Sequence, residues 1–72
     1  MITIGEVLPS RKVTVELRFV DEDGRTVTEG HDPKIIAFSS KDQEGTAAKY
    51  KKWEFLHLIP LQKKYIFYVR EH

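Results

Sequence analysis

Residues 49–72 concentrate the side chains that could recognise another molecule. They hold six of the eight aromatic residues and six of the twelve Lys and Arg residues, but only two acids. Their formal charge is +4 (6 − 2), whereas residues 1–48 carry −3 (6 − 9). Cations that contact phosphates and rings that stack on bases are typical of proteins that bind single-stranded nucleic acid. In such a site the phosphate contacts would be Lys49, Lys51, Lys52, Lys63 and Lys64, and the stacking rings would be Trp53, Tyr65 or Tyr68.

The same segment also predicts a protein contact surface, because residues 53–59 and 65–69 are apolar on both sides of an extended strand. If Tyr65 and Phe67 face a core, Ile66 and Tyr68 point away from it. Exposed apolar patches of several hundred Å² mark interaction sites. The predicted partner-binding residues are Leu56, Leu58, Ile66 and Tyr68, with Lys51, Lys52, Lys63 and Lys64 at the rim. The alternative is that the chain's own residues 39–52, or its first strand, cover this side.

Metal binding and catalysis have weaker support in the sequence. Residues 21–24 (DEDG) are acidic, but the acids that follow lack the spacing of a calcium loop. His57 lies inside an apolar run, and Glu29, His31 and Asp32 are too few to complete a metal site alone. Cysteine is absent, and no glycine-rich phosphate loop or nucleophile motif is present. We therefore expect no enzyme activity, no metal site and no cofactor.

The elements that position these side chains are predicted to be strands. Residues 13–20 alternate between apolar and polar, which is the pattern of a half-buried strand. Asp-Gly at the end of residues 21–24 predicts a hairpin turn. The fold class is therefore all-β, a small antiparallel β-sandwich or partly open barrel of about six strands, with at most one helical turn near residues 46–52. The predicted strands cover residues 2–8, 12–20, 25–28, 34–38, 53–59 and 65–70.

Three stretches carry a resemblance to a known family. They are VTVELRFVDEDGRTV (residues 13–27), WEFLHLIP (residues 53–60) and YIFYV (residues 65–69). Their order resembles that of the transthyretin-like (prealbumin-like) β-sandwich modules, including the collagen-adhesin B-type repeats. Leu61 stands where that family usually has Gly. The resemblance implies a binding or structural module without catalysis.

Length and composition complete the expectation. Seventy-two residues form a single domain, residues 1–72, and a core this small often needs support from a partner. No apolar stretch is long enough to span a membrane, and no signal peptide is evident, so we expect a cytoplasmic protein or a virion component. The size suits a phage or prokaryotic accessory protein.

The sequence thus predicts a module that self-associates as a homo-oligomer, or docks on a protein partner, through its carboxyl-terminal aromatic hairpin. The alternative is a small nucleic-acid-binding β-barrel that uses residues 49–68.

Overall fold

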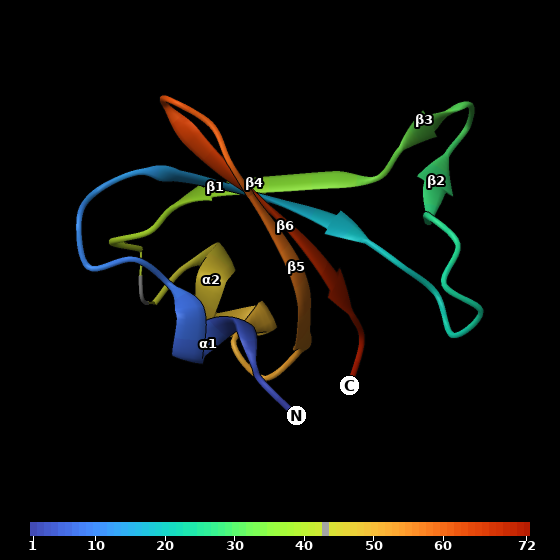
Figure 1. Ribbon diagram of the computed structural model, residues 1–72, viewed down its shortest axis with the longest axis horizontal. Coiled ribbons are helices and arrows are strands. Elements are labelled where there is room, and N and C mark those ends of the chain that lie inside the picture. The colour runs from blue at the N-terminus through green and yellow to red at the C-terminus, as the bar shows by residue number, and fades with distance from the viewer. Residues whose placement is uncertain (43) are drawn as a thin grey trace.

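The computed structural model describes residues 1–42 and 44–72, and its centre is a four-stranded sheet in the order β4-β1-β6-β5 (Figure 1). The two central strands, β1 (Thr14–Phe19) and β6 (Lys64–Arg70), run parallel. β4 (Ile35–Ser39) pairs antiparallel with β1, and β5 (Glu54–Pro60) pairs antiparallel with β6. The sheet is therefore mixed, with its parallel pair at the centre.

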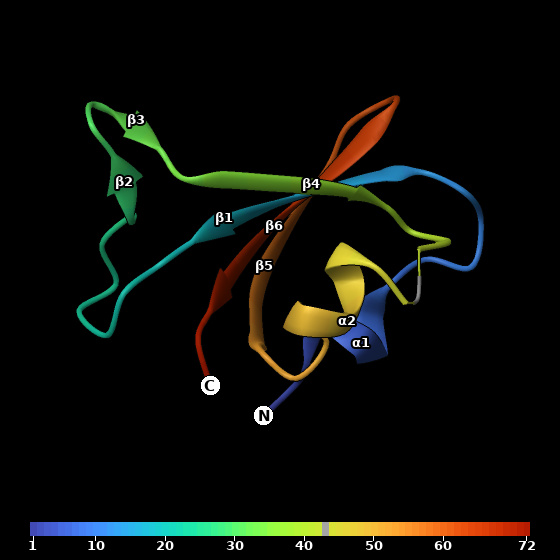
Figure 2. The ribbon, with the colours of Figure 1, turned by 180° about the vertical axis from the view of Figure 1, so that it is seen from behind.

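Two short helices lie on the same side of this sheet (Figures 1 and 2). They are α1 (Ile4–Val7) and α2 (Thr46–Tyr50). The N–H of Thr3 donates to the Glu6 carboxylate (2.9 Å) at the start of α1, which is a capping arrangement. The N–H groups of Ile4 and Gly5 donate to the carbonyls of Trp53 and Lys51 (3.0 Å each), so α1 is bound to the chain between α2 and β5.

The hydrophobic core lies between the sheet and the two helices. The alternation of β1 directs one set of its side chains at the helices, and α2 contributes Ala47 and Tyr50 while α1 contributes Ile4. The fully buried Phe67 and Val69 extend this layer onto β6. The buried core residues are Ile4, Val13, Val15, Leu17, Phe19, Phe38, Ala47, Tyr50, Phe67 and Val69.

A two-stranded ribbon stands away from the helices at the other end of the molecule (Figure 1). It consists of β2 (Thr28–Glu29) and β3 (Asp32–Pro33), joined through Gly30 at a φ of 65°. The predicted turn at residues 21–24 is present, with Gly24 at a φ of 81°. The predicted pairing of residues 12–20 with residues 25–28 is present in part. Val27 N–H donates to the Phe19 carbonyl (2.8 Å), Asp21 N–H donates to the Arg25 carbonyl (2.8 Å), and Thr26 bridges to Val20, but a regular strand begins only at Thr28, in β2.

The predicted all-β class, with about six strands and a helical turn near residues 46–52, is confirmed. Two details were wrong. The strands are not all antiparallel, because a long connection joins β1 to β6 and permits a parallel pair, which a hairpin cannot form. The predicted first strand at residues 2–8 is largely replaced by α1, which covers the core that a second sheet was expected to cover.

Candidate interaction surface

The side of the sheet opposite the helices is the candidate site, and we call it the outer face. Strand registers place its residues in rows across the sheet, two of which cross all four strands. Within residues 1–42 and 44–72, both helices lie on the other side (Figures 1 and 2). The rows are Ser39, Thr14 and Lys64; Ala37, Glu16, Ile66 and Ile59; Ile35, Arg18, Tyr68 and His57; and Arg70 with Glu54.

An ion-pair network holds the middle of the outer face. Arg18 donates from Nε and Nη2 to Oε2 of Glu16 (3.1 and 3.0 Å), and Lys64 Nζ donates to Oε1 (3.1 Å). The Glu16 side chain is only 12% exposed, whereas Arg18 and Lys64 are 29% and 40% exposed. Burial by itself raises the pKa of Glu16, but the hydrogen bonds from Lys64 and Arg18 outweigh it and hold the pKa below its ordinary value. Glu16 therefore stays ionised and fixes two cations on the sheet.

An apolar and aromatic strip lies beside this network on the β5–β6 hairpin. Ile66 is buried among its neighbours, and Ile59 lies opposite it on β5. In the next row the rings of Tyr68 and His57 lie 6.2 Å apart, with Tyr68 half-buried and His57 exposed. The end of the strip is closed by Arg70, whose Nε and Nη2 donate to Glu54 Oε1 (3.1 and 3.0 Å). The strip is an apolar centre with charged groups on two sides.

The structure does not place all four of the predicted apolar contact residues on the outer face. Ile66 and Tyr68 lie on the outer face as predicted. Ile66 is only 7% exposed, however, because its neighbours on the sheet cover it, so of these two residues it is Tyr68 that offers surface to a partner. Leu58 does not lie on the outer face, because it pairs with Phe67 and packs against the core on the helix side. Leu56 is unpaired at a β-bulge and is exposed.

The bulge explains the error. The register of β5 shifts between Phe55 and His57, so strict alternation fails at Leu56. Every residue after Leu56 therefore faces the opposite side from the one that alternation predicts. His57 and Ile59 consequently occupy the outer face, where strict alternation places Leu56 and Leu58.

The four predicted rim lysines do not form one rim. Lys63 and Lys64 lie at the tip of the β5–β6 hairpin, whereas Lys51 and Lys52 follow α2 at the start of β5. The seven residues of β5 separate the two pairs by about 23 Å at 3.3 Å per residue. Only Lys64 joins the outer face, through Glu16.

The three predicted stacking rings also do not share one surface. Trp53 packs edge-on against Phe19 (5.4 Å) and Tyr50 (4.9 Å) on the helix side. Tyr65 shares that side, where its hydroxyl accepts a hydrogen bond from Arg11 (3.0 Å). Tyr68 alone of the three lies on the outer face. The predicted phosphate-binding lysines and stacking rings are thus distributed over several surfaces. The nucleic-acid alternative stays a prediction.

Glu16, Arg18, His57 and Ile59 are among the outer-face residues that were not predicted as contact residues. The alternation of β1 predicts that Glu16 and Arg18 point away from the core, so the sequence carries a signal for their place on the outer face. It carries none for their pairing with Lys64, because that pairing depends on the parallel register of β1 and β6. The positions of His57 and Ile59 depend on the bulge, which the alternation of β5 does not reveal.

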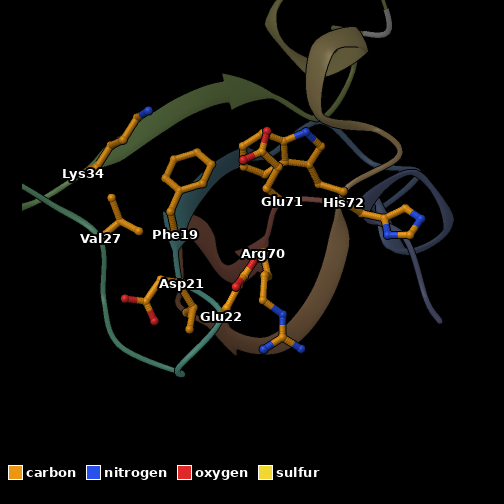
Figure 3. Close-up of a pocket in the computed structure, with 10 residues that line it drawn as sticks. Phe19, Asp21, Glu22, Val27, Lys34, Arg70, Glu71 and His72 are labelled. Atoms are coloured by element: carbon orange, nitrogen blue, oxygen red, sulfur yellow. The ribbon is translucent and has the colours of Figure 1, made fainter.

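A separate cavity of about 510 Å³ opens where β1 and β6 end (Figure 3). Two of its basic groups have partners: Lys34 Nζ lies 5.1 Å from the centroid of the Phe19 ring, and Arg70 pairs with Glu54. The acids in its wall do not converge, and no three potential metal ligands come together within the described residues. The lining residues are Phe19, Val20, Asp21, Glu22, Val27, Lys34, Trp53, Arg70, Glu71 and His72.

Comparisons of the chain with protein-family models, with curated proteins and with solved structures gave no match. The resemblance to the transthyretin-like modules therefore stays a prediction. Neither α1 nor α2, the helices found in residues 1–42 and 44–72, has the length and apolar character needed to cross a membrane.

Proposed function

We propose that this protein is a non-catalytic interaction module that docks a protein partner on the outer face of its sheet. One observation carries the proposal: both helices lie on the same side of the sheet, and the other side presents an aromatic and apolar strip on the β5–β6 hairpin. This is the hairpin predicted from the sequence as the contact element, with His57 and Ile59 in place of Leu56 and Leu58.

The strip has the composition of an interface centre. Tyr68 offers a large ring with a polar hydroxyl, and such residues anchor many protein contacts. His57, which is exposed, and Ile59, which is half-buried, lie beside Tyr68 in the strip. The ion pairs of Glu16 and Glu54 hold Arg18, Lys64 and Arg70 in fixed positions around it. Side chains that are already ordered lose less conformational entropy when a partner binds.

Site-specific photocrosslinking tests this proposal and captures the partner in the same experiment. A photoreactive phenylalanine analogue is placed at position 68, and in a matched variant at position 48. Ala48 is exposed on α2, on the helix side of the sheet. Both proteins are expressed in the native cells and irradiated.

The proposal predicts a discrete crosslinked species from position 68 and none from position 48. The species from position 68 should also disappear when excess unmodified protein competes for the partner. Equal labelling from both positions, or labelling from position 48 alone, would contradict docking on the outer face.

A further inference from the structure

The two edge strands of the sheet differ in how they are protected from pairing with another chain. The β5 edge is protected: Phe55 N–H donates to the carbonyl of Ile2 (2.8 Å), and Thr3 bridges to Glu54. The same strand contains the bulge at Leu56 and ends at Pro60. Covering segments, bulges and prolines are the devices by which proteins prevent an edge strand from pairing with another chain.

Among the residues that the structure describes, none gives the β4 edge these devices. β4 is the last strand of the sheet on its side, and its register with β1 is continuous over all five residues. Its sequence, IIAFS, contains no charge, no proline and no glycine. Ile35 is 42% exposed and Ala37 is also exposed. An uncharged, regular edge strand is a template for a further strand.

The backbone groups of β4 can be assigned to the two sides of the strand. Ser40 N–H donates to Val13 O (2.8 Å), and antiparallel pairing alternates hydrogen-bonded and non-hydrogen-bonded positions. Ile36 and Phe38 therefore direct their N–H and C=O groups at β1. Ile35 and Ala37 direct theirs at the open edge.

We propose that this edge binds the β4 strand of a second copy of the chain, antiparallel and centred on Ala37. This register pairs the whole strand with itself: Ala37 opposes Ala37 of the second copy, and Ile35 opposes Ser39. It brings no like charges together, because the strand has none. The small Ala37 at the two-fold axis permits close approach, and Ile36 lies across from Phe38 on the helix side.

The pairing makes one continuous eight-stranded sheet from two chains. The two outer faces then lie side by side on the same surface. The dimer is therefore distinct from the proposed docking of a protein partner, and it would present two docking strips instead of one.

The test compares Ala37→Lys with Ala48→Lys in sedimentation equilibrium over a wide range of protein concentration. A charge on an edge strand opposes strand addition, whereas the same substitution on α2 does not touch the edge. The wild type and Ala48→Lys should approach twice the 8.4 kDa of one chain, and Ala37→Lys should remain at 8.4 kDa. A wild type that remains at one chain mass at millimolar concentration would overturn the proposal.

Amide hydrogen exchange supplies a second readout that does not depend on a variant. The amides of Ile35 and Ala37 should become protected as protein concentration rises, while those of Ile36 and Phe38 should be protected throughout. A dimer that Tyr68→Asp disrupts, and that leaves Ile35 and Ala37 unprotected, would assign self-association to the outer face and overturn pairing at the edge.

Discussion

Replacing Glu16 by Gln gives a quantitative test of the outer-face network. Gln keeps the shape of Glu16 and one acceptor oxygen, but it removes the charge that holds both Arg18 and Lys64. The amide NH₂ group of the Gln side chain is then directed at one of the two cations, Arg18 or Lys64. The substitution therefore changes the electrostatics of the network with little change in packing.

The magnitude follows from the exposure of the three side chains. Hydrogen bonds to charged groups contribute about 1.5–3 kcal/mol, whereas exposed ion pairs contribute about 0–1 kcal/mol. Glu16 is 12% exposed, which favours the upper range, but Lys64 is 40% exposed and is largely screened by water. We expect Glu16→Gln to lower the free energy of unfolding by about 1–2 kcal/mol near neutral pH. In a domain of this size that loss lowers Tm by roughly 4–15 °C.

The dependence on pH is a sharper test. The pKa of Glu16 in the folded protein lies below its ordinary value of 4.5. Its stabilising contribution is therefore fully present above about pH 4.5 and is lost as the pH falls through the folded pKa. Protonated Glu resembles Gln, so the stability difference between wild type and variant should disappear in acid.

Urea denaturation at pH 7 and at about pH 2.5 measures this difference directly. Glu54→Gln is the matched control, because the Glu54 and Arg70 side chains are 28% and 33% exposed, and its cost should stay below about 1 kcal/mol. Equal stability of Glu16→Gln and wild type at pH 7, or an undiminished gap at low pH, would refute this account of the network.

Two further substitutions test the packing that positions the site. Ser40→Ala should reduce the free energy of unfolding by about 1–3 kcal/mol, since the buried Ser40 Oγ accepts from Val13 N–H (2.9 Å) and donates to the Arg11 carbonyl (2.6 Å). Ser39→Ala is its control in urea denaturation, and an equal loss in both variants would contradict this role. Leu58→Asp should cost at least about 2 kcal/mol, because it places a carboxylate against the core. Leu56→Asp, at the exposed bulge, should change stability by no more than about 0.5 kcal/mol. Melting curves that rank the two variants in the reverse order would contradict the position of Leu58 against the core.

Local patterns in the sequence predicted much of the fold. The alternation of residues 13–20 predicts β1 and its buried side, and Asp-Gly predicts the turn at Gly24. Both features depend on neighbouring residues only. The parallel pairing of β1 with β6 depends on contacts between distant segments, and no local pattern specifies it.

The candidate site could be predicted in part for the same reason. Ile66 and Tyr68 follow the regular alternation of β6, so their place on the outer face was predicted correctly. The bulge at Leu56 has no glycine to mark it, and it reverses the assignment of His57 and Leu58. At the amino terminus, Ile2 and Ile4 alternate as in a strand, but the capping contact between Thr3 and Glu6 starts α1.

Docking on the outer face is tested most directly by the affinity of Tyr68→Asp for the partner that photocrosslinking identifies. Titration calorimetry with purified proteins should show binding at least about 30-fold weaker than wild type, the loss typical of an anchor residue. Ala48→Asp should bind as wild type does, and melting curves should show that both variants are folded. Wild-type affinity in a folded Tyr68→Asp protein would contradict docking through the outer face.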